Sequence, residues 1–147
     1  YDDAMAAYNL IKNRDDTDAD FIALFGRSLG GAIAIDLATK VECYRLITDG
    51  TFSSLRDMGK KSFPYTPMFL LAPDKYNNIK KISNVQVPKL FFHGTEDEIV
   101  PFSFGNKLYN RANEPKEFYA INGAGHNDTY LIEGDLYFEK IKKFLEQ

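Results

Sequence analysis

Hydrophobic and polar positions divide the first forty residues into regular elements and turns. Apolar residues recur at helical spacing across residues 4–11, and a polar break follows at residues 13–20. Residues 21–25 then form a continuous apolar run, which is typical of a strand buried on both faces of a parallel sheet. A glycine-rich turn at residues 26–31 leads into an apolar stretch at residues 32–40. The pattern therefore predicts helix, strand and helix in that order.

The rest of the chain continues this alternation of strands and helices. Three further strands are predicted at residues 45–48, 89–92 and 117–121. After Pro101 a helix is predicted whose apolar face contains Phe104, Leu108 and Ala112. A closing helix is marked by Tyr137, Ile141, Phe144 and Leu145. Strands that alternate with helices indicate an α/β fold, in which helices cover both faces of a parallel sheet.

Composition and charge narrow the class of protein. The 147 residues are enough for one domain with a core, and the net charge of −3 comes without a basic cluster, which argues against nucleic acid as a partner. The longest apolar runs are too short to span a bilayer. A single cysteine, Cys43, excludes an internal disulfide, and no cluster of cysteine and histidine suggests a metal.

Candidate chemistry begins with the sequence GRSLG at residues 26–30. A GxSxG motif between a buried strand and a helix predicts a nucleophile elbow, a sharp turn that exposes the Ser28 hydroxyl at the end of the strand. We expect Gly26 and Gly30 to be required because side chains there would collide with the turn. A glycine-rich turn without chemistry has the same local pattern. The spacing excludes a dinucleotide fingerprint and a P-loop.

A serine nucleophile needs a base and an acid that orients it. His126 lies in a glycine-rich loop after the last predicted strand, whereas His93 ends a strand, where a packed and hydrogen-bonded residue is the simpler interpretation. The acid is expected just after the strand at residues 89–92. Composition does not choose among Glu96, Asp97 and Glu98, and a solvated acidic turn has the same composition.

Three motifs in this order resemble the α/β-hydrolase superfamily. They are GRSLGG at residues 26–31, HGTEDEIVP at residues 93–101 and GAGHND at residues 123–128. They are most similar to the alpha/beta hydrolase domain-containing serine hydrolases, the branch of domain-containing protein 13 and the protein depalmitoylases. The similarity covers the whole chain, and peptidase-like relatives share much of it. It implies a catalytic role for Ser28, Asp97 and His126, with the Leu29 amide as one oxyanion donor.

The resemblance also implies an activity. A serine hydrolase of this kind cleaves a carboxylic ester or thioester through an acyl-enzyme. The substrate would be a small-molecule ester or an acylated protein, and no metal or organic cofactor is implied. The alternatives are a serine peptidase with the same triad, and a non-catalytic α/β module or inactive fragment.

Only part of that fold is predicted from these residues. The family's sheet has eight strands, and the last four are assigned here. We expect residues 1–147 to be the C-terminal part of an α/β-hydrolase domain, without the loop that supplies the second oxyanion donor. One such donor is typically worth about 2.7–4 kcal/mol in the transition state. The strand at residues 21–25 is then an edge strand, and the chain alone is expected to be poorly active. The composition is of a cytoplasmic type, and any membrane anchor would precede residue 1.

Residues 51–88 contain four of the six prolines and predict short helices and loops, which we expect to form a cap. Its apolar residues either line a pocket for an acyl chain or pack the cap onto the sheet. The pocket candidates are Phe63, Tyr65, Met68 and Phe69. Lysines in the same segment are either solvated or face a membrane surface.

Overall fold

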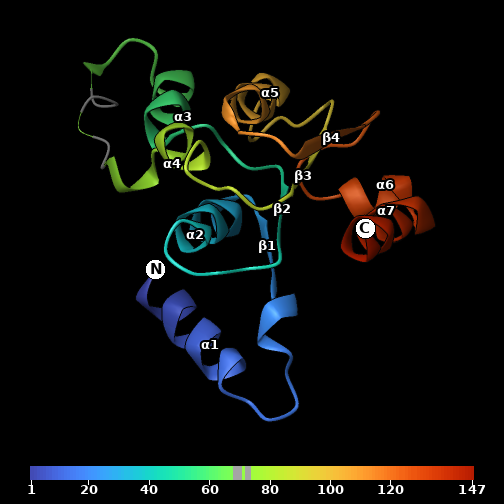
Figure 1. Cartoon of the computed structure of the whole chain (residues 1–147). Helices are drawn as coiled ribbons and strands as arrows, with labels where there is room; N and C mark the ends of the chain where they lie inside the picture. The colour runs from blue at the N-terminus through green and yellow to red at the C-terminus, as the bar shows by residue number, and fades with distance from the viewer. Residues whose placement is uncertain (68–70, 72–73) are drawn as a thin grey trace.

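Four parallel strands form one sheet in a computed structural model that describes residues 1–67, 71 and 74–147. The strands lie in the order of the sequence, so that each pairs with its successor (Figure 1). They are β1 (Ala23–Arg27), β2 (Arg45–Asp49), β3 (Lys89–Gly94) and β4 (Lys116–Ile121). The predicted α/β class with its last four parallel strands is confirmed.

Helices connect the strands and cover the sheet (Figure 1). They are α1 (Asp2–Lys12), α2 (Leu29–Ala38), α3 (Leu55–Ser62), α4 (Asn78–Ile82), α5 (Phe102–Arg111), α6 (Thr129–Glu133) and α7 (Asp135–Glu146). Among the described residues, short 3-10 helices occupy Ala19–Phe21 and Asp74–Tyr76. Across the described ranges, no helix is both long and apolar enough to cross a membrane.

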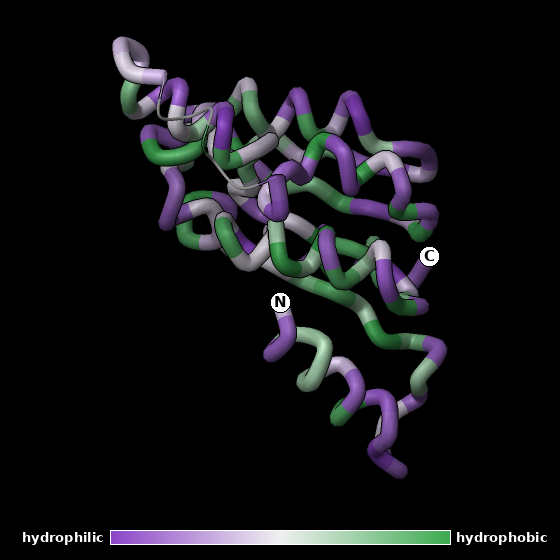
Figure 2. Tube along the Cα trace, turned by 90° about the vertical axis from the view of Figure 1, so that its left-hand side faces the viewer, coloured by the Kyte–Doolittle hydropathy of each residue, from purple (hydrophilic) through white to green (hydrophobic). Residues whose placement is uncertain are grey.

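The core has one layer on each face of the sheet because neighbouring residues of a strand point in opposite directions. On one face α2, α4 and α5 pack around Ile35, Leu46, Phe91 and Leu108. On the other face α7 packs around Ile47, Leu90, Phe92, Tyr137 and Phe144. Figure 2 shows α1 at one end of the molecule, where it contacts α2. The predicted three-layer arrangement is therefore present.

The first strand differs from its prediction. The apolar run at residues 21–25 was expected to be the strand, but its first residue closes a 3-10 helix, and β1 begins at Ala23. Asp18 caps that 3-10 helix by accepting a hydrogen bond from the Asp20 amide. The expected burial on both faces is also wrong, since Phe25 is 51% exposed. The reason is that β1 is an edge strand, as the sequence also predicted.

The final part of the segment expected to form a cap belongs to the core instead. Ile82 and Val85 are buried among residues of α2, α5 and the sheet. The Asn78 side chain, also buried, donates a hydrogen bond to the Phe52 carbonyl and so ties α4 to the start of the segment. By contrast, α3 contains no buried residue. Residues 51–54 are buried as well, so α3 and residues 63–67, within the described part of the segment, stay on the surface as a cap would.

Candidate active site

Ser28 occupies a strained turn between β1 and α2. Its φ of 51° and ψ of −117° make it the only residue other than glycine with a positive φ in the described part of the chain. Such a conformation persists only where the surroundings hold it. Here the Ser28 amide donates to the Asp49 carbonyl at 2.8 Å, and the Ser28 carbonyl accepts from the Gly31 amide. Ser28 is the N-cap of α2, but its side chain caps no helical amide, which leaves the hydroxyl free.

The glycines around Ser28 have unequal roles. A Cβ on Gly26 would lie 2.3 Å from the Gly30 carbonyl oxygen, so the expected steric requirement holds there. The same expectation is wrong for Gly30, whose Cβ would meet no atom within 4 Å. Gly31 is the second restricted position, since its Cβ would lie 1.8 Å from the Thr51 Oγ1 atom. That contact comes from twenty residues away, and nothing local in the sequence signals it.

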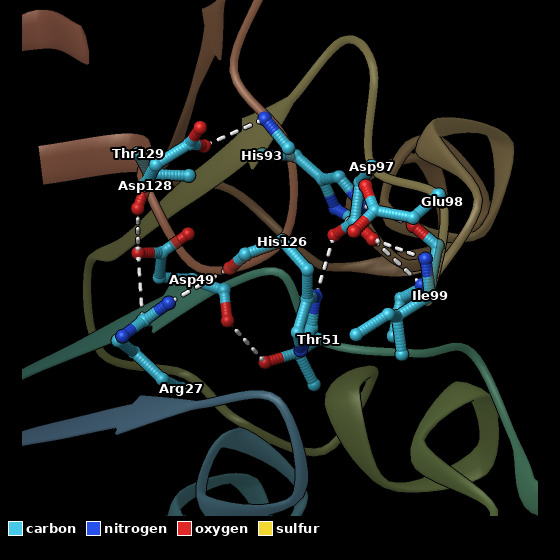
Figure 3. A network of polar contacts seen from close by, with 12 residues as sticks. Arg27, Asp49, Thr51, His93, Asp97, Glu98, Ile99, His126, Asp128 and Thr129 are labelled. Carbon is cyan, nitrogen blue, oxygen red and sulfur yellow. Dashed lines mark hydrogen bonds and ion pairs between the residues drawn. The ribbon is translucent and has the colours of Figure 1, made fainter. Parts of the chain in front are cut away.

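Asp97 lies buried in the loop after β3, whereas its neighbours Glu96 and Glu98 are exposed. Its Oδ1 atom accepts hydrogen bonds from the amides of Ile99 (3.0 Å) and Val100 (2.7 Å). Its Oδ2 atom lies 2.7 Å from the Nδ1 atom of His126 (Figure 3). The structure thus joins Asp97, and neither glutamate, to His126 by a hydrogen bond.

The protonation of this pair follows from its surroundings. Burial is the largest influence on the Asp97 carboxyl and raises its pKa, but hydrogen bonds from His93, His126 and the Val100 amide together outweigh it, and the pKa is lowered. An ionised carboxylate only accepts hydrogen bonds. The Nδ1 atom of His126 must therefore donate, which leaves the Nε2 atom of a neutral ring as an acceptor. That is the tautomer a general base requires.

The second histidine, His93, is packed in the core. His93 is buried at the end of β3, and its Nε2 atom donates to the Val100 carbonyl at 2.9 Å while lying 3.4 Å from the Asp97 Oδ2 atom. A Cβ on Gly105 would lie 2.1 Å from the His93 Nδ1 atom, so α5 closes over the ring. The geometry matches the simpler interpretation of His93 and gives it a role in holding Asp97.

Gly50 lies where the Ser28 turn and the His126 ring approach each other. It follows β2 with a φ of +56°, and a Cβ there would lie 3.2 Å from the His126 ring and 3.4 Å from the Asp97 Oδ2 atom. Because Arg27 and Asp49 are paired in the sheet, Ser28 and Gly50 leave neighbouring strands side by side. Among the described residues, no hydrogen bond joins Ser28 to His126. The motif Asp49-Gly50 was visible in the sequence, but its place beneath the imidazole was not.

A buried polar network below His126 was also missed. Asp49 accepts hydrogen bonds from Thr129 and Tyr137, and its ion pair with Arg27 is seen in Figure 3. Burial and the charge of Asp49 raise the pKa of the Tyr137 hydroxyl, so that it donates throughout the physiological range. Tyr137 had been assigned only to the core, and Thr129 belongs to α6, a helix the sequence pattern did not predict.

The remaining predicted residues are exposed wherever the structure describes them. Leu29 is the first residue of α2, where helix amides lack an intrahelical partner, and its side chain is 49% exposed. Of the pocket candidates, Phe63 and Tyr65 are 60% and 98% exposed, so neither is enclosed. Met68 and Phe69 lie outside the described residues. Lys61 donates to the carbonyls of Glu98 and Ile99 and so ties α3 to the acid loop.

Comparison with known proteins identifies relatives over nearly the whole chain. Residues 1–145 match the model of the prolyl oligopeptidase family. The chain is 36% identical over 145 residues to an uncharacterized protein of Mycobacterium tuberculosis, covering 99% of this chain and 52% of that protein. It is 35% identical over 147 residues to alpha/beta hydrolase domain-containing protein 17B of Homo sapiens, covering 100% of this chain and 49% of the relative. The chain thus spans about half the length of these relatives.

A solved structure has the same fold. The acetyl xylan esterase from Paenibacillus sp. R4 superimposes with a TM-score of 0.81 at 18% sequence identity, covering 98% of this chain and 50% of that one. At this identity the likeness concerns the fold alone. The superfamily resemblance inferred from the three motifs is confirmed by the sequence relatives.

Proposed function

Because this chain belongs to the prolyl oligopeptidase family and has the α/β-hydrolase fold, we propose that it is a serine hydrolase of carboxylic esters or thioesters. The observation that carries the proposal is the 2.7 Å hydrogen bond between Asp97 and His126, beside a serine held at positive φ. A strained serine, a ring with a free Nε2 atom and a buried carboxylate are the groups that nucleophilic acyl transfer requires.

In the proposed reaction the Ser28 Oγ atom attacks the acyl carbonyl carbon. Its proton passes to the His126 Nε2 atom, and the carbonyl oxygen becomes an oxyanion that the Leu29 amide stabilises at the N-terminus of α2. The C–O or C–S bond to the leaving group then breaks, and His126 returns the proton to the departing oxygen or sulfur. Water repeats the sequence on the acyl-enzyme, and the acid leaves. No step requires a metal or an organic cofactor.

Asp97 supports this cycle without taking up a proton. Its lowered pKa keeps it charged at neutral pH, where it stabilises the imidazolium formed after proton transfer. Two backbone amides and His93 hold the carboxylate in place, so its orientation does not depend on substrate. Glu96 and Glu98 lack such contacts in the described structure and are not proposed to take part.

A serine peptidase is the second candidate. The description of the matched family, prolyl oligopeptidase, favours it, and the triad chemistry would be the same. Ester cleavage is preferred because the three motifs most resemble the domain-containing serine hydrolases. The proposed substrates are small-molecule esters or acylated proteins.

Hydrolysis assays with matched substrates test both candidates. The full-length protein is incubated with a p-nitrophenyl ester, a thioester and a peptide anilide, beside the Ser28→Ala variant. We expect hydrolysis of the ester and thioester that is lost in Ser28→Ala, and little cleavage of the anilide. Faster cleavage of the anilide would favour the peptidase. A folded protein without any Ser28-dependent hydrolysis would exclude the proposal.

A further inference from the structure

Asp49 is a buried carboxylate that the proposed reaction does not use. It ends β2 and is 1% exposed, and its Oδ2 atom accepts two hydrogen bonds and lies within ion-pair distance of Arg27. The Thr129 hydroxyl donates at 2.7 Å and the Tyr137 hydroxyl at 3.0 Å, while the Arg27 Nε atom lies 3.3 Å away. These groups come from three separate elements, β1, α6 and α7. A charge this deeply buried is retained only with such partners.

Arg27 extends the network to the loop of the base. Its Nη2 atom donates a hydrogen bond to the His126 carbonyl at 2.7 Å. One guanidinium therefore contacts the Asp49 carboxylate and the main chain of His126 (Figure 3). Arg27 also directly precedes Ser28. The residue that holds the histidine loop (residues 123–129) is therefore part of the turn that carries Ser28.

The histidine loop is thus fixed at two points three residues apart. Arg27 holds the His126 carbonyl, and Asp49 holds the Thr129 hydroxyl. The main chain of Asp49 meanwhile accepts the hydrogen bond of the Ser28 amide at 2.8 Å. Asp49 therefore contacts the nucleophile turn through its backbone and the histidine loop through its side chain.

Before His126 the loop is held by the Gly123 amide, which donates to the Thr95 hydroxyl, and by the Ala124 carbonyl, which accepts from the Glu96 amide. The main chain of His126 itself is held by Arg27. Gly123 has a φ of +75°, and neither it nor Gly125 has a side chain that could pack and restrict the loop. The bond from Asp97 orients the imidazole at one atom, but it does not fix the main chain that carries the ring. A displacement of about 1 Å between reacting groups can reduce catalysis by about 10²-fold.

We propose that Arg27 and Asp49 are positioning residues that hold the main chain of His126 at a fixed place relative to Ser28. The proposal rests on the function proposed above. It assigns a purpose to the arginine within the GRSLG motif and to the aspartate that ends β2. Tyr137 and Thr129 complete the arrangement by donating to the Oδ2 atom of the buried carboxylate, whose Oδ1 atom has no hydrogen-bond partner among the described residues.

Asp36 offers a matched control. It is also a buried carboxylate, and it pairs with Lys40 and Lys81 at 2.6 Å each. It lies on α2, however, and contacts neither the Ser28 turn nor the histidine loop. Replacing Asp36 removes a buried ion pair and changes stability, as replacing Asp49 does, without touching the support of His126.

The experiment compares Arg27→Gln, Asp49→Asn and Asp36→Asn in the full-length protein. Two quantities are measured: the kinetics of p-nitrophenyl ester hydrolysis, and the backbone ¹⁵N order parameters of residues 125–128. We expect Arg27→Gln and Asp49→Asn to lower kcat about 10- to 100-fold with little change in KM. The order parameters of the loop should fall in both variants. Asp36→Asn should keep the kcat and loop order of the unsubstituted protein.

Further variants keep the test decisive if Asp49→Asn does not fold. Tyr137→Phe removes a single donor to Asp49 and is expected to lower kcat about 3- to 10-fold. Arg27→Lys keeps the positive charge but has one ammonium nitrogen in place of the several guanidinium nitrogens that contact Asp49 and His126. It is therefore expected to recover only part of the kcat lost in Arg27→Gln. Full activity and unchanged loop order in folded Arg27→Gln and Arg27→Lys would overturn the proposal. An equal loss in Asp36→Asn would do so as well.

The two proposals fail in different ways. If the unsubstituted protein shows no Ser28-dependent hydrolysis, the proposed function fails, and the loop order parameters still decide whether Arg27 and Asp49 fix the loop. If hydrolysis is present but the Arg27 and Asp49 variants retain kcat and loop order, only the positioning role is excluded.

Discussion

The two halves of the candidate site differ in how firmly they are held. Asp97, His126 and His93 are all buried, Asp97 is hydrogen-bonded to His126 and lies 3.4 Å from His93, and every residue of β3 is buried as well. On the other side, Ser28 is half-buried at the end of an edge strand, beside the exposed Leu29 side chain. The proposed acid and base are thus held in place without substrate, whereas the proposed nucleophile is open to its surroundings.

This difference follows from what each group has to do. A charged acid and a base keep a defined tautomer only where partners are fixed and water is limited. A nucleophile must instead be reached by a substrate, and its strained turn supplies the orientation that burial supplies for the others. The two halves meet through the Arg27–Asp49 pair, so substitutions on either side should have distinguishable effects.

The largest expected effect is on ester hydrolysis, and it differs between the two histidines that contact Asp97. His126→Ala removes the proposed base and is expected to lower ester hydrolysis by at least about 10³-fold, because proton transfer from Ser28 is lost. His93→Gln should cost stability, about 1–3 kcal/mol through a disturbed buried hydrogen bond, and retain far more activity. Rates and melting curves of both variants are the measurement. An equal loss of activity in the two would contradict the assignment.

The next effect contrasts two glycines of the nucleophile turn. Gly26→Ala drives a methyl group into the backbone of Gly30, which is not free to move, so we expect a loss of about 3 kcal/mol in the free energy of unfolding. Gly30→Ala meets open space within a helix and should be neutral or stabilising by about 0.5 kcal/mol. Urea denaturation measures both. Equal destabilisation would mean that the turn is not as tight as described.

Acid should weaken the buried half through Asp97. Its pKa is lower in the folded protein than in the unfolded chain, so its contribution to stability is complete above the ordinary aspartate value of about 3.9. That contribution is lost as the pH falls below this value, because the Asp97 carboxylate of the folded protein then becomes protonated. Melting temperatures between pH 7 and pH 3 should therefore decline more steeply in the unsubstituted protein than in Asp97→Asn. Parallel curves would contradict the lowered pKa.

The smallest effect is expected in the exposed segment before α4. Phe63→Ala and Tyr65→Ala remove side chains that are mostly in solvent, so the free energy of unfolding should change by less than about 0.5 kcal/mol. If these residues receive an acyl chain, as proposed from the sequence, KM should rise for long-chain esters and not for a short-chain ester. Unchanged KM values for both chain lengths would remove Phe63 and Tyr65 from the substrate pocket.

Local patterns predicted what depends on neighbours in sequence. The alternation of strands and helices and the turn at Ser28 could be read in advance, whereas the edge position of the first strand was predicted from the family resemblance. The limits of β1 could not be predicted, because the cap formed by Asp18 turns the start of the apolar run into a 3-10 helix. The short helix α6 lacks a periodic apolar face, which explains why no pattern marked it.

Contacts between distant residues account for what was missed in the site. Gly31 is restricted by Thr51, and Gly50 lies beneath His126, although neither partner is near in sequence. Asp49 looked like the end of a strand, and Tyr137 like a core residue of the closing helix. Their hydrogen bond spans 88 positions and arises only when α7 packs beside β2. Resemblance to a family named the acid and base, but it did not reveal the network that supports them.

The most direct test of the central claim is to map a covalent label. The full-length protein is treated with a fluorophosphonate, digested, and the modified residue is identified by mass spectrometry. If Ser28, His126 and Asp97 act together, one adduct forms on Ser28, and its rate of formation falls by at least about 10³-fold in His126→Ala. An adduct on another residue, or labelling of Ser28 at an unchanged rate without His126, would contradict the account.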